Sequence, residues 1–336
     1  MRVGIEAWLA TANRHQRVAL LSHQAALLST GETSAQAMYR HFGENFKALF
    51  GPEHGYFGRA AAGEETITDM HPSWGIPVYS LYGKDRKPTP EMLAGIDTLV
   101  IDLQDLGVRC YTYLATLKLA LEACQENGVE CVVCERPTPL YGMSSGPIAE
   151  PEHFSFVAPC ALPLVYGMTH PEVAQWLQLP HTAACMEGCE RSAERPLDAP
   201  EFLPPSPAIR SWETARIYPS TVFAEALPQL DIGRATPYAF RMLGAPWIKG
   251  QALAEELNTV GLPGLTAYDF TQSTANGAVR FHLTDFNAYD PWQVTTRLLQ
   301  TLQKCYGSEH LFDHPEARPA WMTQLCGTDK WRDILA

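Results

Sequence analysis

The chain has 336 residues, a formal net charge of -12 and 46% hydrophobic residues. A chain of this length favours two domains, and its apolar fraction supplies a real core, which argues against disorder. The negative charge and the lack of a Lys/Arg cluster argue against a nucleic-acid partner. No stretch reaches the length of a membrane span, and the N-terminus lacks the apolar core of a secretory signal.

The nine cysteines have no regular spacing. Cys131 and Cys134 lie in an apolar run that is typical of a strand, where residues three apart point to opposite faces. Buried inert thiols are therefore a better interpretation than a metal or redox pair. Cys185 and Cys189 lack the second pair that a zinc finger requires. Reduced thiols without a secretory signal predict a cytoplasmic protein.

Strands and helices alternate along the first half of the chain. Apolar runs bounded by Gly, Pro or Asn predict the strands, and capping residues predict where the helices begin. This alternation is typical of a parallel sheet with right-handed crossovers, so we expect an α/β fold with a Rossmann-like sheet. The expected strands are 17–21, 46–50, 76–82, 97–103 and 129–134, and the expected helices are 33–41, a short one from Pro90, and 112–126.

The sequence lacks the phosphate-binding signatures that often accompany such a sheet. No Gly-x-Gly-x-x-Gly follows any expected strand, and no Gly-x-x-x-x-Gly-Lys-Ser/Thr occurs in the chain. The expected fold is therefore Rossmann-like without a dinucleotide fingerprint, and we expect no nucleotide cofactor.

The pattern changes around residues 141–160, which are rich in Gly, Ser and Pro. We place the domain boundary there, and expect one domain at 1–148 and a second, α+β domain at 149–336. The second half predicts helices at 170–179, 250–259 and 291–305, a half-buried strand at 278–285, and an extended proline-rich segment at 196–219.

A loop rich in glycine follows the expected strand at 46–50. It carries Glu53 and His54 between Gly51-Pro52 and Gly55. Loops at the carboxyl ends of strands are where open α/β sheets bind ligands. Gly and Pro favour a fixed, tight loop, as a positioned acid or base requires. The alternative interpretation is a helix-capping acid beside a surface histidine.

Polar residues follow four of the expected strands. These ends are Ser22-His23-Gln24, Glu53-His54, Asp102 to Asp105, and Glu135-Arg136. Because all strands of a parallel sheet end at the same edge, we expect these side chains to converge. This convergence is stronger evidence for a site than any one of the four ends.

The segment from Asp102 to Tyr113 is the richest of these ends. Strand alternation places Asp102 and Gln104 on one face, and Asp105 enters the turn. An ion pair between Asp105 and Arg109 that fixes the turn is the structural alternative to a functional Asp105. For Asp102 and Gln104 a functional role is favoured, because uncharged neighbours leave no other evident reason for a buried carboxylate.

Several motifs resemble signature segments of the exo-β-N-acetylmuramidase family, long described as a domain of unknown function. The resemblance runs from about residue 17 to about residue 290, and its first two motifs are highly specific. The matching segments are Gly51-Pro-Glu-His-Gly55, Asp102-Leu-Gln-Asp-Leu-Gly-Val-Arg-Cys-Tyr-Thr-Tyr113, Arg136-Pro-Thr-Pro-Leu-Tyr-Gly142, Gly167-Met-Thr-His-Pro-Glu172, Pro205-Ser-Pro207, Tyr218-Pro-Ser-Thr221 and Gly244-Ala-Pro-Trp-Ile248.

The resemblance implies a glycoside hydrolase that releases N-acetylmuramic acid from the non-reducing ends of peptidoglycan fragments, in cell-wall recycling. It implies that 1–148 is a Rossmann-like catalytic domain and that 149–336 is an auxiliary domain closing the active-site cleft. Glu53, in the Gly-Pro-Glu-His-Gly loop, matches the family's catalytic glutamate.

Some segments depart from the family pattern. Tyr166 stands where relatives usually carry His, Glu225-Ala-Leu-Pro replaces Glu-Gly-Thr-Asn, and Gly233-Arg-Ala-Thr236 replaces Gly-Arg-Gly-Thr. The chain also stops short of the usual C-terminal end. These changes leave Glu53 in place and bear on the distal contacts with the substrate.

Cleavage of a glycosidic bond requires a proton donor with a raised pKa. Glu53 is the expected general acid/base, and burial beside Tyr56 and Phe57 would raise its pKa. The oxocarbenium-like transition state then requires a nucleophile, a water-activating base or the acetamido oxygen of the substrate. Asp102 or Asp105 would orient that group.

The expected partner is a saccharide or muropeptide. The lactyl carboxylate of muramic acid calls for a cationic fork, for which Arg109 and Arg136 are candidates and Arg234 is the next. Tyr111, Tyr113 and Tyr166 would stack on the sugar or pack in the core. The predicted substrate-binding residues are His54, Gln104, Arg109, Tyr111, Arg136, Tyr166 and Arg234.

Two other functions are open from the sequence. A metal-dependent hydrolase has suitable ligand types, but no His-x-x-x-His or comparable spacing supports it, so we expect no metal. A homologue that binds muropeptides without cleaving them is the non-enzymatic alternative. The residues that would serve a metal are His23, His54, His71, Asp69 and Asp102.

Overall fold

The computed structural model describes residues 1–234, 236–271 and 276–334. The chain forms two compact units, and each unit is built from three separate segments of the sequence. This arrangement differs from the predicted division into 1–148 and 149–336, which has a single boundary. The segment Gly167–Pro207 packs with the first unit because one of its strands joins the large sheet. The first unit comprises Met1–Gly107, Tyr111–Gly142 and Gly167–Pro207, and the second comprises Val108–Cys110, Met143–Tyr166 and Ala208–Ala336.

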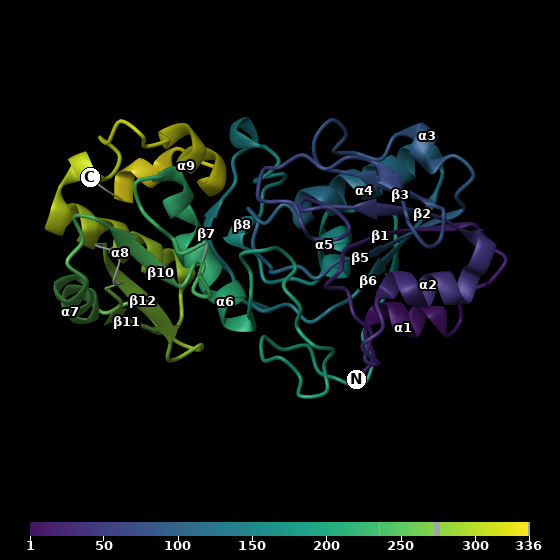
Figure 1. The fold of residues 1–336 in the computed structure, drawn as a ribbon, viewed down its shortest axis with the longest axis horizontal. Coiled ribbons are helices and arrows are strands. Elements are labelled where there is room, and N and C mark those ends of the chain that lie inside the picture. The colour runs from purple at the N-terminus through teal and green to yellow at the C-terminus, as the bar shows by residue number, and fades with distance from the viewer. Residues whose placement is uncertain (235, 272–275, 335–336) are drawn as a thin grey trace. The chain divides into compact units, whose positions relative to one another are not determined.

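A seven-stranded sheet forms the centre of the first unit (Figure 1). Its order is β3-β4-β2-β1-β5-β6-β9, and every neighbouring pair is parallel except β3 with β4. The predicted α/β fold is therefore confirmed. The strands are β1 (Val18–Ser22), β2 (Phe46–Gly51), β3 (Asp69–Met70), β4 (Pro77–Ser80), β5 (Thr98–Asp102), β6 (Glu130–Cys134) and β9 (Thr182–Ala184).

Helices cover both faces of this sheet, α1 and α2 on one and α3, α4 and α5 on the other (Figure 1). Thr33 begins α2 by accepting a hydrogen bond from the Gln36 N–H at 3.2 Å. Gly128 ends α4 in the left-handed conformation, with φ of 66°. The helices are α1 (Gly4–Leu9), α2 (Ser34–Phe42), α3 (Pro90–Leu93), α4 (Tyr113–Asn127) and α5 (His170–Trp176).

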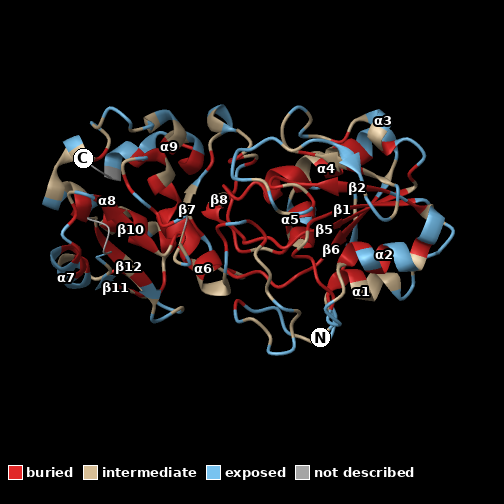
Figure 2. Ribbon diagram, in the orientation of Figure 1, coloured by how far each residue is buried: buried red, intermediate tan, exposed pale blue. Residues whose placement is uncertain are grey.

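The core of the first unit lies on the central strands, which Figure 2 shows as almost wholly buried. All five residues of β1 and all five of β5 are buried, as expected for strands covered on both faces. Two polar residues, Ser22 and Asp102, stand opposite one another at the carboxyl ends of these strands. The apolar strands thus carry polar groups at one edge of the sheet.

The second unit has an antiparallel sheet of order β10-β12-β11 and a β7-β8 pair, so the expected α+β character is confirmed. Helix α7 packs on β11 and β12, and α8 packs on α6 and α7. The elements are β7 (Ser145–Ile148), β8 (Pro163–Val165), β10 (Met242–Ala245), β11 (Leu265–Asp269), β12 (Gly277–Leu283), α6 (Trp212–Thr221), α7 (Gly250–Val260), α8 (Pro291–Tyr306) and α9 (Pro319–Cys326).

The prediction of an extended segment over 196–219 is wrong for its last part, which belongs to α6. Ser211 caps this helix by accepting a hydrogen bond from the Thr214 N–H at 3.1 Å. Pro219 lies inside the last turn and has no N–H to donate to the carbonyl of Ala215, four residues earlier, so helix propensity argues against a helix here. A count of prolines alone therefore missed the helix.

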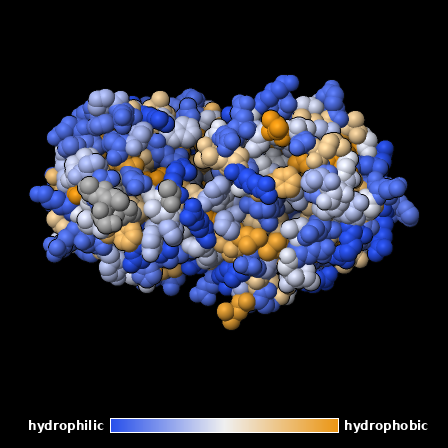
Figure 3. All heavy atoms as spheres, in the orientation of Figure 1, coloured by the Kyte–Doolittle hydropathy of each residue, from blue (hydrophilic) through white to orange (hydrophobic). Residues whose placement is uncertain are grey.

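The described helices include none that is long and apolar enough to cross a bilayer. The face in Figure 3 is mostly hydrophilic, and its hydrophobic side chains occur in small separate groups.

Candidate active site

The carboxyl ends of four parallel strands meet at one edge of the first unit's sheet. β2 pairs with β1, β1 with β5, and β5 with β6, all in parallel. The predicted convergence of these strand ends is confirmed by this pairing. The polar residues that follow them are buried: His23, Glu53, His54, Asp102, Gln104, Asp105, Glu135 and Arg136.

Glu53 is held by three donors in the first unit. Its Oε1 accepts a hydrogen bond from the Gly63 N–H at 2.9 Å, and its Oε2 accepts one from the Thr112 hydroxyl at 2.7 Å. The Tyr82 hydroxyl also bonds to this carboxylate. Burial, together with the charge and hydrogen bond of Glu53, raises the pKa of Tyr82 to about 12. Glu53 is only 8% exposed, so its geometry is fixed rather than solvent-averaged.

The loop that carries Glu53 has an unusual backbone. A Cβ at Gly51 would lie 2.3 Å from the Tyr56 nitrogen, so only glycine fits there. His54 adopts a φ of 72°, which is uncommon for a residue with a side chain and is often found at functional sites. Its Nδ1 lies 2.8 Å from the Ala60 carbonyl oxygen. The expected burial of Glu53 is confirmed, and of its two aromatic neighbours in sequence Tyr56 is buried whereas Phe57 is exposed.

Asp105 and Tyr111 lie near Glu53 in the same unit. Asp105 Oδ2 accepts a hydrogen bond from the Gly107 N–H at 3.0 Å, which holds the carboxylate in a turn. Burial raises the pKa of Tyr111, and the negative charges of Asp105 and Glu53 raise it further. The rings of Tyr111 and Tyr113 are 4.6 Å apart. The structure thus brings a neutral tyrosine hydroxyl into the field of two of the three predicted catalytic carboxylates, Glu53 and Asp105.

Asp102 lies deeper and has a structural partner. Arg136 Nε lies 2.6 Å from Oδ1 and Arg136 Nη2 lies 2.7 Å from Oδ2. The Ser34 hydroxyl donates to Oδ2, and Arg136 also donates to the Leu27 carbonyl at 2.9 Å. The premise that Asp102 has only uncharged neighbours was therefore wrong. The ion pair with Arg136 explains why the Asp102 carboxylate is buried. All described hydrogen bonds of the Arg136 guanidinium go to Asp102, Leu27 and Ser34.

Gln104 and His23 form a second buried group at the same edge. The Gln104 side chain donates to the carbonyls of Asp105 and Pro137 at 3.0 and 2.9 Å, and its backbone N–H donates to His23 Nε2 at 2.9 Å. Burial lowers the pKa of His23 well below its usual range, and the nearby Arg136, His54 and His170 lower it further. His23 is therefore a neutral acceptor.

Arg109 belongs to the second unit and is fully buried. Its Nη1 donates to the carbonyls of Pro147 and Leu162 at 2.8 and 2.6 Å. Its Nη2 donates to the Leu325 carbonyl at 3.1 Å and to the Cys326 carbonyl. All described hydrogen bonds of the guanidinium thus go to backbone oxygens, and the expected ion pair with Asp105 is not among them.

Tyr166 and Arg234 also lie in the second unit. Tyr166 is buried, whereas the Arg234 side chain is 42% exposed. Arg234 forms an ion pair with Glu225, in one of the segments that depart from the family pattern, and lies 5.0 Å from the Phe240 ring centre. It is the most exposed of the three arginines predicted to bind a carboxylate.

Two polar residues at the sheet edge escaped the prediction. Thr112, the donor to Glu53, lies in the motif that ends at Tyr113, and only its place between two predicted tyrosines could have drawn attention to it. His170 begins α5 and lies 3.7 Å from Asp105 Oδ2. The segment from Gly167 to Glu172 matches the family pattern. This match could have pointed to His170 as a candidate site residue.

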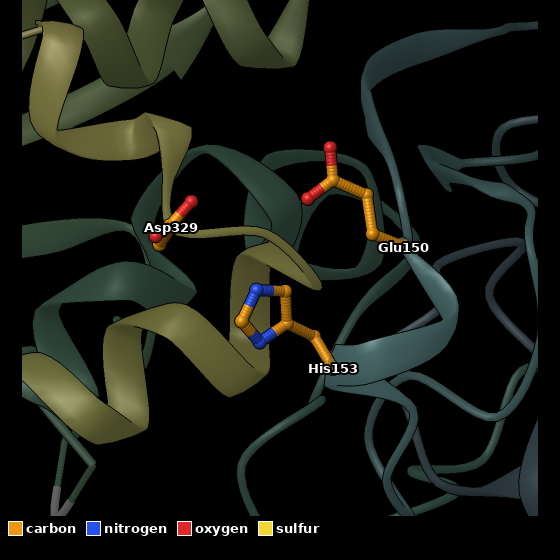
Figure 4. Close-up of side chains that lie close together, drawn as sticks. All are labelled: Glu150, His153 and Asp329. Atoms are coloured by element: carbon orange, nitrogen blue, oxygen red, sulfur yellow. The ribbon is translucent and has the colours of Figure 1, made fainter.

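Potential metal ligands gather elsewhere. Among the residues that the structure describes, Glu150, His153 and Asp329 of the second unit are the group whose ligand atoms lie within 4.8 Å of one another (Figure 4). Glu150 already accepts from Thr328 at 3.1 Å and pairs with Lys330, which holds the pKa of Glu150 below its usual range. The five residues considered for a metallohydrolase do not form such a group within the described ranges.

Comparisons with known proteins match this chain over most of its length. The family model for the N-terminal part of the exo-β-N-acetylmuramidase NamZ matches residues 18–213, and the model for the C-terminal part matches residues 216–336. The peptidoglycan β-N-acetylmuramidase NamZ of Bacillus subtilis is 36% identical over 312 residues, covering 88% of this chain and 75% of that protein.

Two solved structures share the fold. A DUF1343 family protein from Bacteroides fragilis superposes with a TM-score of 0.89 at 31% identity, covering 99% of this chain and 90% of the other. A second DUF1343 family protein from the same organism gives a TM-score of 0.73 at 23% identity, with the same coverage. With both family models matched in order, this chain belongs to the exo-β-N-acetylmuramidase NamZ family.

Proposed function

We propose that this protein is an exo-acting glycoside hydrolase that releases β-linked N-acetylmuramic acid from the non-reducing ends of peptidoglycan fragments. Family membership and the relation to the Bacillus subtilis enzyme support the reaction class. A cytoplasmic enzyme of cell-wall recycling would meet such fragments as small muropeptides, and the free thiols of all nine cysteines suit that location.

Glu53 is the proposed general acid/base. The observation that carries this assignment is a single carboxylate held by Gly63, Thr112 and Tyr82 at the carboxyl end of β2. In its protonated form, Glu53 would donate to the glycosidic oxygen as the bond to the anomeric carbon breaks. The donors come from the loop at Gly63, the bend at Tyr82 after β4 and the start of α4 at Thr112, and together they keep the carboxyl group in one orientation, which proton transfer requires.

Asp105 is the proposed second carboxylate of the reaction, in preference to Asp102. Both oxygens of Asp102 are engaged by Arg136 in a buried ion pair. Asp105 and Glu53 instead both lie close enough to Tyr111 for their negative charges to raise its pKa. A carboxylate at Asp105 would stabilise the positive charge that develops on the sugar or orient the acetamido group beside it.

The specificity for muramic acid requires a cation for the lactyl carboxylate. Arg109 and Arg136 would have to give up buried hydrogen bonds to serve it, which costs free energy. Arg234 is therefore the preferred candidate, because its guanidinium is partly exposed and its present partner is one surface-accessible glutamate.

Turnover of a chromogenic β-N-acetylmuraminide by the purified protein tests the proposed function. We expect hydrolysis by the wild type and slower hydrolysis of the matching β-N-acetylglucosaminide. Binding of a muropeptide without release of the chromophore would instead identify a non-catalytic homologue. Loss of turnover in EDTA that Zn²⁺ or Mn²⁺ restores would favour the metal-dependent hydrolase.

A further inference from the structure

His170 is a buried histidine whose ring nitrogens have no hydrogen-bond partner in the part of the chain that the structure describes. It is 3% exposed. Buried polar atoms in native proteins are nearly always paired, so each exception calls for an explanation. The charged group that faces the ring is the Asp105 carboxylate, with Oδ2 at 3.7 Å from Nε2.

The backbone places both residues firmly. Thr169 caps α5 directly before His170, and its N–H donates to Glu172 at 2.8 Å while its hydroxyl donates to Glu135 at 3.2 Å. The Asp105 carboxylate accepts a hydrogen bond from the Gly107 N–H. Gly107 has a φ of 79°, which only glycine adopts readily. The short gap between the imidazole and the carboxylate thus lies between the first residue of α5 and a turn held by the Gly107 N–H.

We propose that His170 is a positioning residue that donates its Nε2–H to Asp105 and thereby orients this carboxylate for glycoside hydrolysis. This inference rests on the proposed function. A separation of 3.7 Å is too long for a hydrogen bond in the unliganded protein, and catalytic hydrogen bonds are often long until the substrate binds. Closure by less than 1 Å would form the bond.

The protonation state agrees with a neutral donor. Burial lowers the pKa of His170, while the charges of Asp105 and Asp102 act in the opposite direction. The neutral ring carries one N–H, and the carboxylate beside Nε2 favours the tautomer with its proton there. His23 interacts electrostatically with His170. It is itself neutral because burial lowers its pKa. Asp105 would then gain an oriented donor.

Kinetics of four single variants and one double variant with the chromogenic muraminide test the inference. His170→Ala should lower kcat by about a hundredfold, as misplacement of a reacting group by 1 Å can do, with little change in KM. His170→Gln should restore part of the rate, because its amide nitrogen can replace Nε2–H. His170→Phe should keep an aromatic ring at this position without a donor and remain slow. Asp105→Asn and His170→Ala/Asp105→Asn complete the set.

The double variant separates a role through Asp105 from a role in packing. If His170 acts on Asp105, adding His170→Ala to Asp105→Asn should cost less than about threefold, because coupled residues are not additive. Equal losses in both backgrounds, or a His170→Phe variant as fast as the wild type, would overturn the inference. His41→Ala, in the last turn of α2, which covers one face of the sheet, is the control for loss of a partly buried histidine and should retain the wild-type rate.

NMR of the imidazole nitrogens gives a readout that does not depend on turnover. We expect the Nε2–H tautomer of His170 at neutral pH, and a further lowering of its pKa in Asp105→Asn, because the carboxylate charge raises that pKa. An Nδ1–H tautomer would overturn the inference. A wild type that shows no turnover contradicts the proposed function, whereas an active wild type with an equally active His170→Phe contradicts the inference alone.

Discussion

Arg136 donates to both carboxylate oxygens of Asp102, at 2.6 and 2.7 Å, and both side chains are almost fully buried. This relationship joins the ends of β5 and β6 and explains why two charged residues occur in the interior. It also distinguishes Asp102, whose carboxylate is held in the fold by Arg136, from Glu53 and Asp105, whose carboxylates are proposed to act in the reaction.

Removal of one partner of this pair should destabilise the protein. Arg136→Met leaves the Asp102 charge buried without its partner, so we expect the free energy of unfolding to fall by about 3–5 kcal/mol. Urea denaturation followed by circular dichroism measures this change. The double variant Asp102→Leu/Arg136→Met removes both charges and should be more stable than Arg136→Met alone.

A different result would reassign Arg136. Normal stability of Arg136→Met together with a lost preference for the muraminide over the glucosaminide would show that this arginine reads the lactyl carboxylate.

Glu53→Gln should keep the fold and remove the proton donor. Because general acid catalysis contributes on the order of 10²–10⁴-fold, we expect a loss of turnover in that range. The rate of release of the chromophore and the melting temperature are the measurements. Glu64→Gln is the matched control, because Glu64 lies in the same loop, is exposed, and accepts from the Ala61 N–H. A folded Glu53→Gln variant with a near wild-type rate would remove Glu53 from the mechanism.

Arg109→Met should affect stability and not specificity. It removes one donor from each of four backbone carbonyls, of which Leu162 still accepts from the Ala149 N–H, and one unsatisfied buried group costs about 1–3 kcal/mol. We therefore expect a lower melting temperature and an unchanged ratio of muraminide to glucosaminide rates. A changed ratio at normal stability would contradict the structural role.

Arg234→Met should affect specificity and not stability. A charge-assisted hydrogen bond is worth roughly 1.5–3 kcal/mol, so loss of this contact should lower the preference for the muraminide by about ten- to a hundredfold. The ratio of kcat/KM for the two chromogenic substrates measures the effect. Arg297→Met serves as a second-unit control, because Arg297 binds the Gly261 carbonyl, and it should leave the ratio unchanged. An unchanged ratio in Arg234→Met would exclude Arg234 from recognition of the lactyl group.

The stability of the protein should rise with pH in the acidic range. The pKa of His23 is well below its usual range because the ring is buried and near Arg136. Below the usual histidine pKa of about 6.5, the unfolded chain binds a proton that folded His23 does not, so stability falls as the pH falls. His23 contributes at most about 1.4 kcal/mol per pH unit. Unfolding free energies measured from pH 7 to pH 5 should show a smaller slope in His23→Gln, and an equal slope would contradict the assignment.

The local elements of the first unit could be predicted from sequence because their signals are local. The apolar run that forms β5 and the Asn127-Gly128 stop of α4 need no knowledge of distant residues. The helix α6 could not be found in this way, since its proline contradicts helix propensity and its cap at Ser211 lies among other prolines. The strand β9 was also missed, because a three-residue edge strand has too few residues to show a pattern.

The sequence by itself determined which polar residues follow the parallel strands, and hence which edge of the sheet carries Glu53. That inference holds because strand direction in a parallel sheet fixes the edge at which every strand ends. Only the tertiary structure decided which partners these residues have: Thr112 with Glu53, Arg136 with Asp102, and His170 beside Asp105. Such pairs join residues 34 to 65 positions apart, and their hydrogen bonds depend on distances and angles that spacing along a chain does not contain.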